Sequence, residues 1–360
     1  MAKQDDSVRL RVDDFDYPLP NDAIAQLPVE PRDAARLLVL DRSASTPGRP
    51  ALSERTVGGL GALLLPGDLL VVNDSRVIPA RLTATRPGGG RAEALLLRAI
   101  DDGSGRWEAL VRPSRHIPSG SWLVLANGER IEVGERLAAG TRAIRFERDV
   151  SDVLADAGEV PLPPYIHDSS APAERYQTVY ALPPGSAAAP TAGLHFTAEL
   201  LASLQSAGVL LASLTLHVGL DTFRPLEGAF VDQHRIHREW YSLPAVTAAV
   251  VAETRRAGGR VVAVGTTTVR VLETAARTGL ASGWSDLYIT PPHAFRAVDA
   301  LMTNFHLPKS SLLLLVTAFV QAGMRNAGPF QARDTLLAAY RTALADGYRF
   351  FSFGDAMFIT

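Results

Sequence analysis

Residues 261–270 read Val-Val-Ala-Val-Gly-Thr-Thr-Thr-Val-Arg, four apolar residues followed by a glycine and a run of threonines. A short apolar run between breakers indicates a buried strand, and glycine followed by hydroxyl side chains is typical of a turn into a helix. We therefore predict a strand over 260–265 and a helix over about 267–277. The N–H groups and hydroxyls at such a helix start suit a carboxylate or phosphate, although capping by Thr266 or Thr267 alone would explain the pattern.

Strand and helix signals alternate on both sides of this stretch. Continuous apolar runs predict buried strands over 36–40, 68–72 and 209–218, and a last strand over 356–359. Capping residues, glycine stops and apolar spacing predict helices over 22–27, 54–64, 197–207, 244–256, 309–322 and 332–344. Such alternation indicates a layered α/β main domain.

The sequence pattern of residues 75–150 differs from that of the segments on either side. Short strand-like segments recur there between turn residues. Six strands are predicted, and Asn127-Gly128 is a strong two-residue hairpin signal. This spacing favours a small antiparallel β-barrel. We expect the barrel domain, residues 75–150, to be inserted into a main domain of residues 1–74 and 151–360. The predicted strands cover 77–83, 92–97, 107–111, 122–125, 130–133 and 141–146.

The composition excludes some classes of protein. The chain has no cysteine, so disulfides, Cys-ligated zinc and iron–sulfur clusters are ruled out. The polar, acidic N-terminus lacks the apolar core of a signal peptide, and the apolar run 312–316 is too short to span a membrane. We expect a cytoplasmic, monomeric protein without a membrane segment.

Charge is distributed unevenly along the chain. The net charge is −2, and only Lys3 and Lys309 among the 36 basic residues are lysines. Residues 75–150 carry 13 arginines and 9 acidic residues, a net charge of +4, which leaves −6 for the remainder. A basic module on an acidic body can face a phosphate backbone, and an arginine-rich solvated surface is an equally good interpretation.

Common catalytic motifs are absent. The chain contains no P-loop, no His-Glu-x-x-His and no Gly-x-Ser-x-Gly. Gly59-Leu60-Gly61 resembles the start of a dinucleotide fingerprint but lacks the third glycine and a preceding strand. His234 and His237 have a spacing that can chelate a metal, yet no clear third ligand follows. We favour a structural or surface role for both and expect no metal.

Three histidines stand at junctions between a strand or loop and the next element: His195, His217 and His306. A lone histidine in such a place is more often a packing residue than a catalyst. Three at comparable junctions favour a shared pocket at the ends of sheet strands, with histidine as the proton-transfer group. Lys309, in a chain that otherwise uses arginine, follows His306 closely and adds a compact ammonium group.

Longer blocks of sequence resemble one known family in collinear order, from residue 15 to the C-terminus. The blocks cover 15–20, 30–33, 66–82, 161–166, 175–180, 188–197, 265–267, 299–310 and 348–357. They are similar to those of the S-adenosylmethionine:tRNA ribosyltransferase-isomerases of queuosine biosynthesis. Several are long and rich in polar residues, so the resemblance is specific.

The resemblance implies a layered α/β body with an inserted β-barrel. It also implies transfer and isomerisation of the ribosyl group of S-adenosylmethionine onto 7-aminomethyl-7-deazaguanine at the tRNA wobble position. Epoxyqueuosine would form, and adenine and methionine would leave. S-adenosylmethionine is then consumed as a substrate, tRNA is the partner, and no separate cofactor is expected.

This chemistry needs a base at the ribose carbon next to the sulfonium, assistance to the departing adenine, and a neutral amine as nucleophile. The resemblance makes His195, His217 and His306 candidates for proton transfer, and which of them does which job stays open. Asp74 and Arg76 are expected as their charged partners. The expected substrate-binding residues are Tyr165, Thr191, Gly193, Phe196, Phe223, Thr266, Thr267, Asn304 and Lys309.

Two loops depart from the family pattern: Asp221 stands where glycine is usual, and Pro291-Pro292-His293 replaces a usual Pro-Gly-Tyr. Both are expected near the site. Two alternative functions remain: an RNA-binding homologue without turnover, which these departures would support, and an S-adenosylmethionine-dependent methyltransferase, for which the glycine fingerprint is missing.

Overall fold

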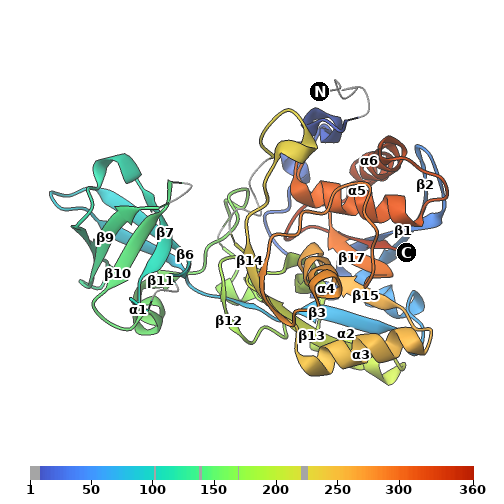
Figure 1. Cartoon of the computed structure of the whole chain (residues 1–360), viewed down its shortest axis with the longest axis horizontal. Helices are drawn as coiled ribbons and strands as arrows, with labels where there is room; N and C mark the ends of the chain where they lie inside the picture. The colour runs from blue at the N-terminus through green and yellow to red at the C-terminus, as the bar shows by residue number, and fades with distance from the viewer. Residues whose placement is uncertain (1–8, 101–102, 138–139, 169, 220–225) are drawn as a thin grey trace.

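Apolar residues alternate between the two faces of a central sheet and give the main domain two cores. Leu69 and Val71 point to one face of the sheet, while Leu70 and Val72 point to the other. The structure, a computed structural model, describes residues 9–100, 103–137, 140–168, 170–219 and 226–360. In these ranges the main sheet has nine strands in the order β16-β14-β13-β3-β15-β17-β18-β1-β2 (Figure 1).

The centre of this sheet is parallel. β13, β3, β15 and β17 run in the same direction, and β14 and β16 extend the β13 edge as antiparallel strands. The carboxyl ends of the four parallel strands β13, β3, β15 and β17 therefore meet at one edge of the sheet. The strands are β1 (Arg36–Thr46), β2 (Arg49–Thr56), β3 (Leu69–Asn73), β13 (Leu210–Leu216), β14 (Glu239–Ser242), β15 (Val261–Val264), β16 (Ser282–Ser285), β17 (Ala300–Asn304) and β18 (Ala356–Ile359).

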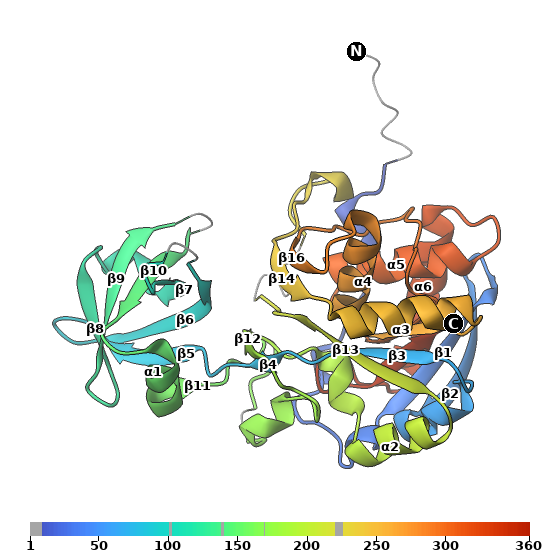
Figure 2. The same ribbon diagram turned by 60° about the horizontal axis from the view of Figure 1, so that its bottom comes forward.

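Helices cover both faces, so the main domain is a three-layer α/β structure. α2 (Ala198–Ser206) packs on one face, and α3 (Ala245–Arg256), α4 (Thr266–Thr278), α5 (Ser311–Gly323) and α6 (Pro329–Ala345) lie on the other (Figure 2). The predicted strands over 36–40, 68–72, 209–218, 260–265 and 356–359 are confirmed, as are the helices that became α2 to α6. The side chain of Thr197 caps α2 as expected, accepting a hydrogen bond from Leu200 N.

Two predicted helices are wrong. Residues 54–64 contain the end of β2 and the 3₁₀ helix Val57–Ala62, because three glycines weaken an α-helix there and pairing with β1 makes a strand. Residues 22–27 contain only the end of the 3₁₀ turn Asn21–Ala23. Pro28 disfavours α conformation at the residue before it. Strands β14 (Glu-Trp-Tyr-Ser), β16 (Ser-Gly-Trp-Ser) and β17 (Ala-Leu-Met-Thr-Asn) were not predicted, since none of them is a continuous apolar run.

The insertion is a closed six-stranded antiparallel barrel, as predicted (Figure 1). The strand order is β5-β6-β7-β10-β9-β8, and pairing of β5 with β8 closes it. After β10 the chain stays with the barrel, because α1 (Val150–Ala157) buries Val153 and Leu154 in the barrel core and β11 (Gly158–Glu159) pairs with β5. The barrel strands are β5 (Arg81–Thr85), β6 (Arg91–Ala99), β7 (Trp107–Arg112), β8 (Ser121–Leu125), β9 (Arg130–Arg136) and β10 (Arg142–Phe146).

Two short strands lie where the chain passes between the domains. β4 (Arg76–Val77) leads from β3 into the barrel and pairs in parallel with β12 (Pro184–Ser186). The barrel is therefore inserted directly after the carboxyl end of β3.

A buried arginine joins the segment before β8 to strand β9, and its removal should destabilise the barrel. Arg142 is 1% exposed, and its guanidinium donates to Ile117 O at 2.9 Å and Gly134 O at 2.7 Å. Arg142→Met should cost about 1–3 kcal/mol for each acceptor left buried without a donor, measured by urea denaturation. Arg145→Met on the same strand is the control, since Arg145 is exposed and its ion pair should contribute about 1 kcal/mol or less. Equal losses in both variants would contradict this role.

Candidate functional site

A pocket lies at the carboxyl ends of the parallel strands, where the loop after β15 enters α4 and the loop after β17 begins. Ligands of α/β sheets bind at this edge. Thr303 and Ser310, which the sequence analysis did not single out, contribute to the lining. Six of the predicted site residues line the pocket together: Tyr165, Thr191, Thr266, Thr267, Asn304 and His306.

Asn304, at the end of β17, joins three segments of the pocket wall. Its amide donates to Phe351 O at 3.0 Å and accepts from Thr191 Oγ1 at 3.0 Å. The Tyr165 ring lies 4.8 Å from the Phe351 ring, and its hydroxyl is 2.7 Å from Ser352 Oγ. Phe351 has a φ of 70°, which is uncommon for a residue other than glycine. The C-terminal loop is thus part of the site.

The start of α4 forms the opposite wall. Gly265 has a φ of 88°, which lets the chain turn from β15 straight into the helix. The first N–H groups of a helix have no partner within it, so Thr266 and Thr267 bring donors and hydroxyls to the pocket. Asn73, at the end of β3, donates to Thr267 Oγ1 at 3.4 Å and to Leu216 O at 3.0 Å. This arrangement suits an anionic group.

His306 is buried in the pocket wall and uncharged. Its Nε2 is 2.9 Å from Thr303 Oγ1, its backbone N–H donates to the Tyr340 hydroxyl at 3.1 Å, and its carbonyl accepts from the Tyr17 hydroxyl. Burial lowers the pKa of His306 to about 3. A neutral imidazole has one N–H donor and one acceptor nitrogen, so at neutral pH this ring is not in its imidazolium form.

His217 follows β13 but lies in a different cavity, a groove between the barrel and the main domain. Its ring stacks on Trp240 at 5.3 Å and 17°, and Gly185 packs so close that a Cβ there would lie 2.8 Å from the ring. Burial lowers the pKa of His217, and the negative charge of Asp74 opposes this shift. Asp74 itself accepts a hydrogen bond from Thr215 Oγ1 at 2.7 Å.

His195 is held in a third place, so the expectation of one pocket shared by three histidines is wrong. Its ring nitrogens lie 3.1 Å from Ala192 O and 3.0 Å from Gly354 O, and burial lowers its pKa. The reason is local: His195 ends a 3₁₀ helix and not a strand of the sheet. Phe196 packs in the apolar core beneath the sheet, and a Cβ on Gly193 would lie 2.2 Å from the Tyr180 hydroxyl.

The two predicted cationic residues lie outside the pocket. Arg76 forms an exposed ion pair with Glu174 at 3.0 Å. Lys309 has a φ of 52°, and its ammonium lies 3.0 Å from Asp13 and 2.9 Å from Asp16. These carboxylates raise the pKa of Lys309. In this structure Lys309 joins the N-terminal segment to the loop that precedes α5.

The remaining sequence observations concern loops. Phe223 and Asp221 lie outside the described residues. His293 packs on Phe295 at 4.7 Å and its Nε2 lies 3.7 Å from the Glu273 carboxylate, away from the pocket. His234 accepts from Glu227 N at 3.3 Å, and within the described ranges no group of three or more His, Cys, Asp or Glu residues has a geometry that could hold a metal.

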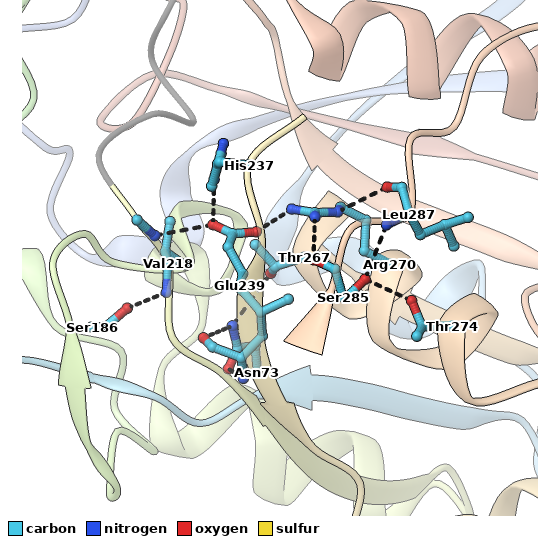
Figure 3. Close-up of polar contacts among 12 residues, drawn as sticks. Asn73, Ser186, Val218, His237, Glu239, Thr267, Arg270, Thr274, Ser285 and Leu287 are labelled. Carbon is cyan, nitrogen blue, oxygen red and sulfur yellow. Dashed lines mark hydrogen bonds and ion pairs between the residues drawn. The ribbon is translucent and has the colours of Figure 1, made fainter. Parts of the chain in front are cut away.

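A buried ion pair, which the sequence analysis missed, joins β14 to α4 (Figure 3). Glu239 on β14 is 1% exposed and pairs with Arg270 on α4, which is 5% exposed. Glu239 also accepts from Gly219 N at 3.0 Å and lies 3.1 Å from His237 Nε2. Arg270 donates in addition to two backbone carbonyls, of Ser285 and Leu287, at 3.3 Å each.

The ionisation of the Glu239 carboxylate is determined by the basic side chains beside it. Burial alone would raise the pKa of Glu239, but Arg270 and His237 lower it from an ordinary 4.5 to about 2. The carboxylate therefore stays charged at any physiological pH. Nothing in the sequence pairs these two residues, which are 31 positions apart.

These features define a two-domain α/β protein with an inserted barrel and a pocket at the edge of the sheet where such folds bind ligands. Residues 12–359 match the family described as queuosine biosynthesis protein. The chain belongs to that family. Within the described ranges, every helix is too short or too polar to span a bilayer.

Relatives over nearly the whole chain carry one name, S-adenosylmethionine:tRNA ribosyltransferase-isomerase. The protein of Symbiobacterium thermophilum is 48% identical over 97% of this chain and 100% of its own length. That of Rubrobacter xylanophilus is 49% identical over 97% and 98%. The crystal structure of S-adenosylmethionine tRNA ribosyltransferase from Thermotoga maritima shares 38% identity and has a TM-score of 0.54, covering 96% of this chain and all of that one.

The Glu239–Arg270 pair predicts a specific acid sensitivity. Because the pKa of Glu239 is lowered on folding, its contribution is fully present above about pH 4.5 and is lost as the pH falls towards 2. Glu239→Gln leaves Arg270 buried without a counter-charge, so unfolding free energy at pH 7 should fall by about 3–5 kcal/mol. The difference in unfolding free energy between Glu239→Gln and the parent should become smaller as the pH falls below 4.5.

Denaturation curves at pH 7 and pH 3 measure this effect. The control is Glu253→Gln, which removes an exposed ion pair with Arg256 and should change stability by about 1 kcal/mol or less. A Glu239→Gln variant as stable as this control would show that the buried pair contributes no net stability.

Proposed function

We propose that the chain transfers and isomerises the ribosyl group of S-adenosylmethionine onto 7-aminomethyl-7-deazaguanine at the tRNA wobble position. The products are epoxyqueuosine in tRNA, adenine and methionine. The observation that carries this proposal is the likeness, over 97% of the chain, to relatives named for that class of reaction. The donor is consumed as a substrate, no further cofactor takes part, and the protein acts as a monomer in the cytoplasm, where tRNA is found.

The pocket at the strand ends is the proposed donor site. The carboxylate of the methionine moiety binds the free N–H groups of Thr266 and Thr267, where the helix dipole favours negative charge. The sulfonium lies against the faces of Tyr165 and Phe351, because a cation is attracted to an aromatic ring. Asn304 and Thr191 offer hydrogen bonds to the ribose.

The three histidines are proposed to act differently, because their surroundings differ. His306, with a pKa of about 3, is suited to stabilising the departing adenine as a neutral hydrogen-bonding group. His217 faces the groove, and Asp74 supports its charged form, so it is the better candidate to accept a proton. His195 has both nitrogens against backbone carbonyls and is proposed to position the η9 segment (Thr191–His195).

Product analysis tests the function directly. The protein is incubated with S-adenosylmethionine and tRNA that carries the 7-aminomethyl-7-deazaguanine base. Mass spectrometry of the digested tRNA should show epoxyqueuosine, with adenine and methionine released in equal amounts and only when tRNA is present. S-adenosylhomocysteine would instead identify methyl transfer, and folded protein that binds this tRNA without forming product would support a homologue without turnover.

Histidine variants separate the proposed roles. Loss of a general acid or base typically lowers the rate on the order of 10²–10⁴-fold. His217→Ala should fall in that range, and His306→Ala should lower the rate on the order of 10²–10³-fold through loss of a hydrogen bond to the departing group. Both should keep the melting temperature of the parent, while His195→Ala should lower it. Single-turnover rates and thermal melts measure both effects. Near-parental rates in all three variants would remove histidine proton transfer from the proposal.

A further inference from the structure

The groove between the two domains concentrates the chain's tryptophans. Its volume is about 840 Å³, and residues of β6 and β7 line it from the barrel while residues of β14 and β16 line it from the main domain. Trp107, Trp240 and Trp284 all line this groove, three of the four tryptophans in the chain. The fourth, Trp122, lies on β8, under the guanidinium groups of Arg130 and Arg145.

Strand register places two of these rings side by side on the surface. Trp240 on β14 is paired directly with Trp284 on β16, and their neighbours Glu239 and Ser285 point inward. Directly opposed residues of antiparallel strands lie on the same face of the sheet. Trp240 is 36% and Trp284 is 40% exposed, so both rings are open to a ligand. His217, stacked on Trp240, extends the row.

Cationic groups border this aromatic row. The Arg98 guanidinium lies 5.6 Å from the centre of the Trp284 ring, although it also pairs with Glu108 at 2.6 Å. Arg238 lines the groove, is exposed, and makes no ion pair with another described residue. Buried Glu239 adds no free negative charge, because Arg270 neutralises it. Among the described residues that line it, the groove therefore offers flat aromatic faces and an arginine without an acidic partner.

That combination matches single-stranded nucleic acid, whose bases stack on aromatic rings and whose phosphates attract arginine. The groove and the proposed donor pocket share a stretch of backbone. Val218 lines the pocket, while the residues before and after it, His217 and Gly219, line the groove. A base bound on the row would therefore lie beside the pocket.

We propose that Trp240 and Trp284 form a stacking platform for an unpaired base of the tRNA loop, next to the base that is modified. The identity of the RNA rests on the proposed function; the stacking chemistry rests on the groove alone. The platform holds the loop open so that the modified base can reach the pocket, and Arg98 and Arg238 contact the adjoining phosphates.

Alanine and phenylalanine variants test the platform. Binding of an anticodon stem-loop with the 7-aminomethyl-7-deazaguanine base is measured by fluorescence anisotropy, and binding of S-adenosylmethionine alone by calorimetry. Trp240→Ala and Trp284→Ala should each weaken RNA binding about 5- to 150-fold, the factor that stacking of one base contributes. Trp240→Phe and Trp284→Phe should retain most of the affinity, and donor affinity should not change. Trp122→Ala is the control and should bind RNA like the parent.

The outcomes separate this proposal from the proposed function. A double alanine variant that binds RNA like the parent, or a parent that binds no RNA, overturns the platform. Loss of donor affinity with unchanged RNA affinity also overturns it, because the rings would then serve the adenine of the donor. If RNA binding falls as expected but the parent forms no modified nucleoside, the platform stands and the proposed function fails.

Discussion

The arrangement of both cavities depends on the buried pair of Glu239 and Arg270. It fixes the edge strands β14 and β16 against α4, the helix whose first turn forms a wall of the pocket. Through Gly219 N, the same carboxylate sets where the chain leaves β13, between the pocket and the groove. Two charges lose their hydration here, and their mutual attraction with three further hydrogen bonds offsets that cost.

Such a pair specifies geometry more than it adds stability. Apolar side chains of similar volume would pack in many ways, whereas the fork of Arg270 can reach Glu239 and the two carbonyls only in one register. If β14 moved by one residue, Glu239 would no longer face Arg270 and Trp240 would be buried, because successive side chains of a strand point to opposite faces. The charged pair therefore determines which side of the edge strands is aromatic and open.

The sequence predicts the parts of this protein that local patterns encode. Continuous apolar runs reveal the central strands, and turn residues reveal the barrel, because each signal lies within ten residues. The edge of the sheet that carries the pocket follows from Thr266, which stands just after the apolar run 261–264. Partners distant in sequence escape such patterns: Arg270 for Glu239 and Gly354 for His195.

The position of the insertion has a consequence for the architecture as a whole. None of the nine strands of the main sheet comes from residues 78–159, and the chain enters and leaves the barrel at almost the same point. A Cβ on Gly158 would lie 2.1 Å from Pro79 O, so the outgoing chain presses against the incoming one. The barrel is thus a separate domain with its own sheet and core, attached to the main domain at a single crossing point of the chain. Its loops can therefore change in length or sequence without altering any strand of the sheet that carries the pocket.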